Sequence, residues 1–205
     1  MLSSNFFLFV GIAILSYGLQ APLLAYFTRK HGSLVVIVYR NIFLACIMLP
    51  ALFLLQKEEV MLIGNHLDLL LPASAFGVVA LTLNLNAFKY LPVAMANILR
   101  QVSDVVLAII IGAIFLHEYL VPSQLFLIGL IISCGCILAI TRSPRIEVLM
   151  PRTGIGLLFA TLAGFSHAFS FFFFSKLVRA TNPIAAGYFW EVFIGISAAS
   201  YLIFL

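Results

Sequence analysis

Two opposite charges lie one helical turn apart inside a long apolar stretch, residues 92–118. Arg100 and Asp104 are four residues apart, so on a helix they share a face and can pair. A charge inside a membrane helix costs about 2.5–3.5 kcal/mol on insertion scales, and such charges are typical of functional sites. Asn97 and Gln101 lie beside the pair. We expect these residues to bind a solute, with Arg100 taking an anionic or carboxylate group in exchange for Asp104; a purely structural pair is the alternative.

The last apolar stretch contains a second candidate, Glu191. A carboxyl group removed from water inside a helix bundle favours its neutral form, so Glu191 could load and release a proton near neutral pH. Arg40 occupies the corresponding place in the second apolar stretch, and a plain Arg40–Glu191 ion pair is the competing interpretation. Gln20 and Tyr17, in the first apolar stretch, are predicted to line the same cavity.

Other residue types that often carry chemistry indicate packing here. His167 is a single histidine on an apolar stretch, and we expect it to hydrogen-bond a neighbouring helix. The phenylalanines at 171–174 and Trp190 are predicted to pack or to face lipid, and not to form an aromatic cage. The four histidines lack metal-ligand spacing, and the sequence has neither a G-x-S-x-G elbow nor a P-loop. We therefore predict no enzyme activity, no cofactor and no metal, and we expect any transport to use a gradient or exchange.

The composition excludes an ordinary soluble domain. Of the 205 residues, 64% are hydrophobic and 9% are charged, whereas a soluble chain averages about 25% charged. The net charge of +4 comes from basic residues that sit singly in short loops, so we predict no nucleic-acid partner. The three cysteines lie in apolar runs and are expected to act as small apolar side chains.

The apolar runs predict seven transmembrane helices, at 6–27, 34–55, 69–88, 92–118, 122–141, 153–174 and 184–205. A 22-residue run is about 33 Å long as a helix, enough for a hydrocarbon core of about 30 Å. Backbone polar groups in lipid must be satisfied within their own helix, so we predict an all-α integral membrane protein. The connections at 28–33 and 56–68 are expected to be loops, the second of them solvated. In the fifth run Gly129 and Ser133 are spaced for close helix packing, and the sixth run carries a row of small residues, Ala160, Gly164 and Ala168.

A weak internal repeat predicts the arrangement of these helices. The segment VGIAILSYGLQ pairs loosely with IGLLFATLAGFSH, five helices later, and each copy is followed by an aromatic-plus-charge doublet, Tyr39-Arg40 or Trp190-Glu191. Copies of an odd-numbered unit insert in opposite directions, as in the inverted repeats of secondary transporters. We therefore expect a first five-helix repeat at 1–145 and a partial second repeat of two helices at 146–205.

A motif between residues 87 and 138 adds a family resemblance. The motif opens with an Ala-x-x-Tyr-x-x-Ala-like pattern and closes the fourth span with a Leu-Gly-Glu-x-Leu-like pattern before a Gly-containing fifth span; the matching residues are Ala87, Tyr90, Ala94, Leu116, Glu118, Leu120 and Gly129. This pattern resembles the drug/metabolite transporter superfamily, in particular the EamA-type permeases. The chain departs from the family at His117, where glycine is usual, and at Asp104, where proline is frequent. It also supplies seven of the roughly ten helices of the family plan.

The resemblance implies a secondary transporter of a small metabolite or drug-like solute in a membrane, most simply the bacterial inner membrane. The alternative is a non-transporting membrane component or truncated relative that acts as an assembly or regulatory partner. The expected partners are membrane lipid, a small-molecule solute, and a homodimer mate or a partner that supplies the missing helices. Six lysines and arginines fall in odd-numbered loops and three in even-numbered ones, which favours an outside N-terminus, whereas the resemblance implies the reverse.

Overall fold

A computed structural model of the protein describes residues 19–55, 57–115, 121–141 and 153–204. Every regular element in these ranges is a helix, which confirms the all-α prediction. Residues 19–31 are helical, and the elements that follow are α2 (Ser33–Leu52), α3 (Lys57–Met61), the 3-10 helix η1 (Leu62–His66), α4 (Leu67–Ala87), α5 (Val93–Phe115), α6 (Pro122–Thr141), α8 (Thr153–Ala180) and α9 (Pro183–Phe204).

Five helical segments of the described chain are long and apolar enough to cross a membrane: Ser33–Leu52, Lys57–Ala87, Val93–Phe115, Thr153–Ala180 and Pro183–Phe204. They correspond to five of the predicted spans. The predicted first span lies largely outside the described residues. In α6, the predicted fifth span, only the part Pro122–Cys134 is identified as an apolar helix, and it is shorter than the other five segments. The count of seven spans stays a prediction.

Both predicted loops contain helical residues, so the two loop predictions are wrong in part. The helix of residues 19–31 and α2 are separated only by Gly32, whose φ of 87° lies in the left-handed region that favours glycine. Lys57–His66 forms helical turns that lead into α4, and Ile63 in this segment is buried against Leu177 and Ala185. The apolar side chain of Ile63 therefore anchors this helical segment, while the charged Lys57 and Glu58 stay exposed as predicted.

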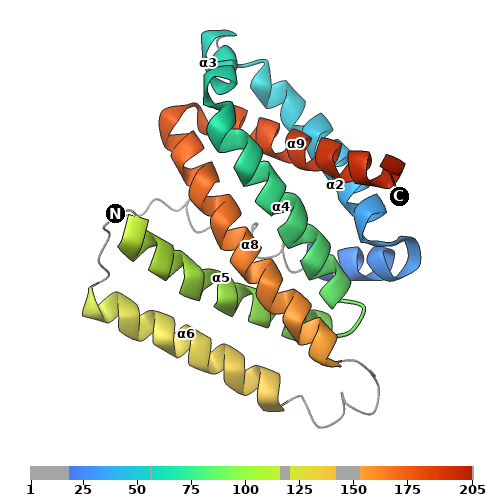
Figure 1. The fold of residues 1–205 in the computed structure, drawn as a ribbon, viewed down its shortest axis with the longest axis vertical. Helices are drawn as coiled ribbons and strands as arrows, with labels where there is room; N and C mark the ends of the chain where they lie inside the picture. The colour runs from blue at the N-terminus through green and yellow to red at the C-terminus, as the bar shows by residue number, and fades with distance from the viewer. Residues whose placement is uncertain (1–18, 56, 116–120, 142–152, 205) are drawn as a thin grey trace.

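The two helices that follow residue 152 pack among the earlier ones (Figure 1). Helix α8 lies against both α4 and α5, while α9 packs against α2 and α4, and α6 contacts α5. The predicted small row on α8 is confirmed, because Ala160, Gly164 and Ala168 are all buried. A Cβ atom at Gly164 would collide with the backbone carbonyl of Arg100, so α8 crosses α5 at very short distance there.

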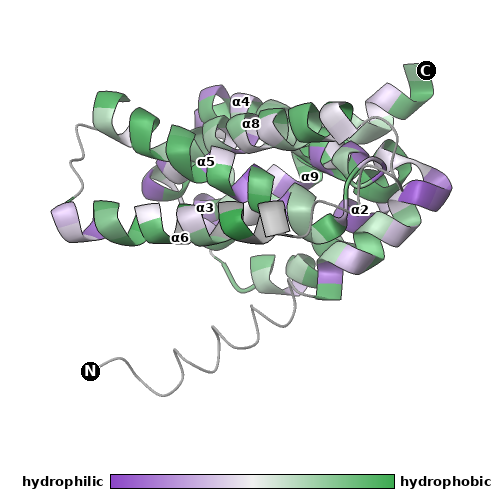
Figure 2. Ribbon diagram, turned by 90° about the horizontal axis from the view of Figure 1, so that it is seen from below, coloured by the Kyte–Doolittle hydropathy of each residue, from purple (hydrophilic) through white to green (hydrophobic). Residues whose placement is uncertain are grey.

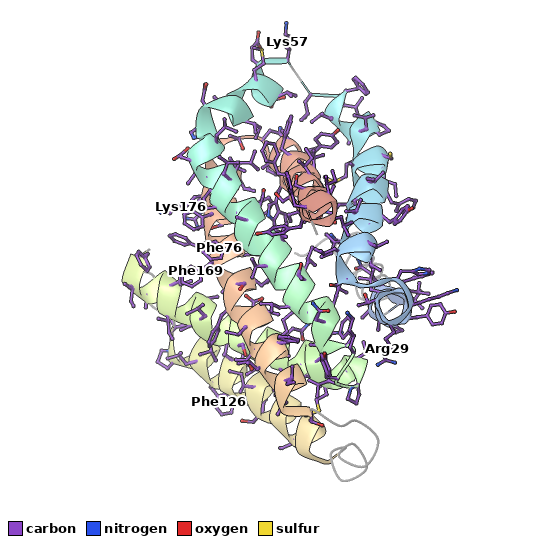
Figure 3. All side chains as sticks on the ribbon, turned by 45° about the vertical axis from the view of Figure 1, so that its right-hand side comes forward. Arg29, Lys57, Phe76, Phe126, Phe169 and Lys176 are labelled. Atoms are coloured by element: carbon purple, nitrogen blue, oxygen red, sulfur yellow. The ribbon has the colours of Figure 1, made fainter. Side chains whose placement is uncertain are left out.

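Many large apolar side chains of the described helices are exposed, and Figure 2 shows hydrophobic residues along the helices seen from below. Phe126 projects from α6 with 72% of its surface exposed. By contrast, Phe76 of α4 and Phe169 of α8 stack with their ring centroids 5.4 Å apart (Figure 3). Apolar side chains that point outward suit a lipid surrounding, so the remaining polar groups are best sought inside the bundle.

Candidate functional site

A cavity of about 430 Å³ lies inside the bundle, between residues 19–31 and helices α2, α4, α5, α8 and α9. Its polar lining comes from six elements of the chain: Gln20, Arg40, Asn84, Asn97, Arg100, Gln101, His167 and Glu191. Five residues predicted from the sequence therefore meet in one place: Gln20, Asn97, Arg100, Gln101 and Glu191. Asp104 is not part of the lining but lies next to it, and Tyr17 lies outside the described residues.

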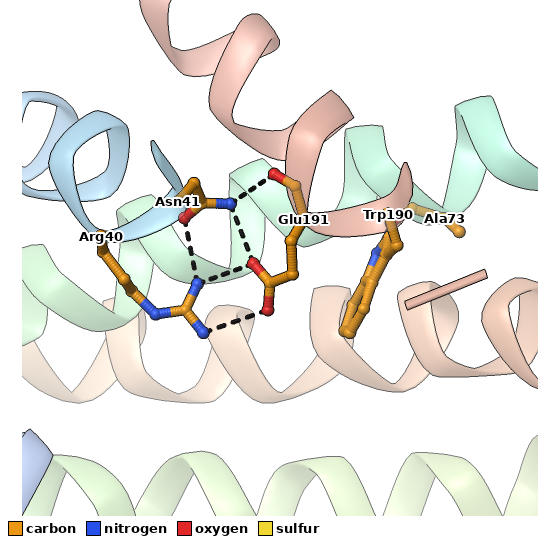
Figure 4. Close-up of polar contacts among 5 residues, drawn as sticks. All are labelled: Arg40, Asn41, Ala73, Trp190 and Glu191. Atoms are coloured by element: carbon orange, nitrogen blue, oxygen red, sulfur yellow. Dashed lines mark hydrogen bonds and ion pairs between the residues drawn. The ribbon is translucent and has the colours of Figure 1, made fainter. Parts of the chain in front are cut away.

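The first charged group of the cavity joins α2 to α9 (Figure 4). Arg40 donates from Nη1 to Oε2 of Glu191 at 2.9 Å and from Nη2 to Oε1 at 3.3 Å. Asn41 donates from Nδ2 to the same Oε2 at 2.9 Å and to the backbone carbonyl of Glu191 at 2.7 Å. The Oδ1 atom of Asn41 accepts a further bond from Arg40 at 3.0 Å. The Arg40–Glu191 ion pair is thus confirmed as a two-pronged, charge-assisted contact.

The ion pair is held from both sides by its surroundings. Asn41 is 1% exposed, so its amide is fixed, and the close approach of α9 is permitted by Gly195, whose added Cβ would lie 3.0 Å from the Cβ of Asn41. Three donor atoms, two of Arg40 and one of Asn41, bind the Glu191 carboxylate. A proton-coupling role for Glu191 stays a prediction. Asn41 escaped the sequence analysis although it directly follows Arg40.

The second charged group joins α5 to α8. Oδ2 of Asp104 lies 2.7 Å from Nδ1 of His167. We had expected Arg100 to be the partner of Asp104, and this was wrong for the described structure, in which the ion pair of Asp104 is formed with His167. The reason is the crossing at Gly164: His167 lies three residues later on the same face of α8, and this brings its ring to the turn that carries Asp104. The expectation that His167 bonds a neighbouring helix is confirmed.

Aromatic rings form one wall of the cavity. Trp190 stacks on Phe174, with ring centroids 4.4 Å apart, and its Nε1 donates to the carbonyl of Ala73 at 3.2 Å. Phe171 meets Trp190 edge to face at 5.8 Å and the ring of His167 at 4.8 Å. Packing of Phe174 and Trp190 is confirmed, but Phe171 and Trp190 also line the cavity, which the sequence pattern did not show.

The cavity thus offers ionic groups, amides and aromatic faces to a ligand. Two arginines, one glutamate and one histidine line it together with side-chain amides at 20, 84, 97 and 101. A volume of about 430 Å³ falls in the range of small-molecule sites. In the part of the chain that the structure describes, no three His, Cys, Asp or Glu side chains converge to hold a metal ion.

Comparison with known proteins gives one family. The profile of the EamA-like transporter family matches residues 5–141, which is about two thirds of the chain. No curated protein and no solved structure gives a significant match. The matched segment includes α2, α4 and α5, whereas α8 and α9 lie beyond it and contribute His167, Phe171, Trp190 and Glu191 to the cavity.

Proposed function

The chain belongs to the EamA-like transporter family, a family of membrane transporters for small solutes, and we propose that it is a secondary transporter of a small organic anion. The proposed drive is a gradient or an exchange reaction, and the substrate is a metabolite or drug-like molecule. The observation that carries this proposal is the cavity of about 430 Å³, whose lining includes Arg100 and the neighbouring amides Asn97 and Gln101.

The choice of an anion rests on the two arginines of the cavity. A guanidinium group presents a planar fork of donors that fits a carboxylate, sulfonate or phosphate group. The fork of Arg40 is already used, because both of its terminal nitrogens bind Glu191. We assign Arg100 to the ligand because it lines the cavity together with two amides of the same helix, Asn97 one turn before it and Gln101 next to it on α5.

The aromatic wall supports an organic rather than an inorganic anion. Phe88, Phe171 and Trp190 line the cavity together with the polar groups. A ligand with one anionic end and one apolar or ring-containing end would match both kinds of surface. Because the structure pairs Asp104 with His167, the ligand does not have to displace Asp104 from Arg100.

Exchange across liposomes tests this proposal. We expect the purified protein, in liposomes loaded with unlabelled toluene-4-sulfonate or a short aromatic carboxylate, to take up the labelled form of the same anion. Toluene-4-sulfonate stays ionised at every working pH and so does not cross the lipid as a neutral acid. Arg100→Gln should lower exchange about tenfold or more, the loss expected when one charge-assisted anion contact is removed.

The matched control for this variant is Lys57→Gln, which removes a positive charge from the exposed α3 at the end of the molecule (Figure 3). Its exchange rate should equal that of the wild type. Exchange of the lipophilic cation tetraphenylphosphonium in place of the anions would overturn the anion assignment. A wild-type protein that exchanges no carboxylate, sulfonate or cation would overturn the transporter proposal and favour a non-transporting membrane component.

A further inference from the structure

We propose that the His167–Asp104 pair binds the proton that accompanies the anion through the cavity. This inference rests on the proposed function and names its coupling ion and the group that carries it. The two side chains belong to different helices, Asp104 to α5 and His167 to α8, and their contact of 2.7 Å spans the interface between them. Asp104 lies within the segment that matches the family profile and His167 lies beyond it.

The position of His167 suits a proton carrier. Its Nδ1 atom is anchored by Asp104, and its ring lines the cavity. Among the described residues no hydrogen-bond partner is found for Nε2, and the side chain keeps 24% of its surface exposed. One nitrogen is therefore held by Asp104, while the ring as a whole lines the cavity. Imidazole is the side chain whose ordinary titration falls between about pH 5 and 8.

The charged groups around the pair determine how a proton on His167 changes the net charge of the site. Arg100 and Asp104 face the cavity region from α5, Arg40 from α2, and Glu191 from α9. Within the described parts, α6 carries no charged residue and the single charge of α4, Asp68, is exposed in its first turn. The two arginines and two carboxylates cancel, so protonation of His167 gives the group one net positive charge. A monovalent anion restores neutrality, and the anion and the proton therefore favour each other's binding.

The resulting transport step is simple in chemical terms. A proton from water forms an N–H bond with the His167 imidazole, the anion binds at Arg100, and both leave on the opposite side, where the proton returns to water. No bond in the substrate changes, and a monovalent anion and a proton together carry no net charge. Glu191 is less suited to this role, because Arg40 and Asn41 already hold its carboxylate with three hydrogen bonds.

Binding of toluene-4-sulfonate at two pH values tests the coupling. Trp190 is the single tryptophan of the chain and lines the cavity, so its fluorescence reports ligand binding at this site. We expect the wild type to bind about tenfold more tightly near pH 5.5 than near pH 8, a typical size for coupling between two sites. His167→Gln, which keeps an amide donor for Asp104 but takes up no proton, should bind with the same affinity at both.

Two further variants serve as a control and as a second test of the coupling. His66→Gln removes an imidazole from η1, outside the cavity, and should keep the wild-type ratio of affinities. Asp104→Asn removes the carboxylate that contacts the imidazole while keeping a hydrogen-bonding side chain, so the ratio of the affinities at the two pH values should fall. This second variant keeps the inference open to refutation if His167→Gln does not fold.

Liposome transport separates a failure of the inference from a failure of the proposed function. With equal pH on both sides, exchange of toluene-4-sulfonate tests the transporter alone; with acid outside, accumulation above the external concentration tests the coupling. The expected result is that His167→Gln exchanges the anion but does not accumulate it. Accumulation by His167→Gln at the wild-type level, or equal wild-type affinity at both pH values, would overturn the coupling while the transporter stands. Absence of any wild-type binding and exchange would overturn both.

Discussion

Two ionic contacts tie α8 and α9 to the earlier helices, and they are built very differently. The Arg40–Glu191 contact of α2 and α9 has two prongs and is reinforced by the buried Asn41. The Asp104–His167 contact of α5 and α8 is one hydrogen bond to a ring that readily changes its charge. The first contact is over-determined and suits a permanent joint. The second rests on a single hydrogen bond and suits a contact that is made and broken.

The largest expected effect comes from breaking the over-determined contact. Arg40→Ala leaves the Glu191 carboxylate partly buried without its cation, and we expect a loss of about 2–3 kcal/mol in the free energy of unfolding. SDS-induced unfolding in mixed micelles measures this loss. His167→Ala should cost clearly less, because a single bond to a neutral or charged ring is lost. Equal losses for the two variants would remove the distinction between a permanent and a switchable contact.

A test of similar kind concerns the two helix crossings. Gly164→Ala places a Cβ against the backbone carbonyl of Arg100 and should cost about 1–3 kcal/mol. Gly195→Ala meets only the Cβ of Asn41, at 3.0 Å, and should cost less. Gly112→Ala on α5 is the matched control, because its Cβ meets no atom of the described structure within 4 Å; it should be neutral or stabilising. The same unfolding assay ranks the three variants, and a destabilised Gly112→Ala would contradict this account.

The sequence predicted the helices and the cavity residues better than it predicted their partners. Apolar runs of sufficient length identify helices whatever surrounds them, which is why five predicted spans reappear in the structure. The Arg40–Glu191 ion pair, the competing interpretation for Glu191 in the sequence, is confirmed. Asp104 was assigned to Arg100 because spacing along one helix is visible in the sequence. The crossing of α8 and α5 at Gly164 brings His167 to Asp104, and residue spacing along one helix does not predict how two helices cross.

The charged residues of the segment 57–66 led to the wrong prediction of a loop. Its lysine, glutamates and histidine suggested a solvated loop, yet its helical turns are anchored by the buried Ile63. The aromatic wall shows the same limitation. A run of four phenylalanines contains residues on every side of a helix, and only the position of α9 decides that Phe174 stacks on Trp190 while Phe171 reaches the cavity.

The smallest expected effect is at Phe171, which links the two contacts. Its ring lies 4.8 Å from that of His167 and 5.8 Å from that of Trp190, and Trp190 precedes Glu191 in the chain. If the ligand lays a ring on this wall, Phe171→Leu removes one aromatic contact and should weaken binding of toluene-4-sulfonate about three- to tenfold. Methanesulfonate has the same anionic group without a ring, so its affinity, measured by competition, should be unchanged. An equal loss of affinity for both sulfonates would mean that Phe171 does not contact the ring of the ligand. Phe171 would then act by positioning His167 in its contact with Asp104.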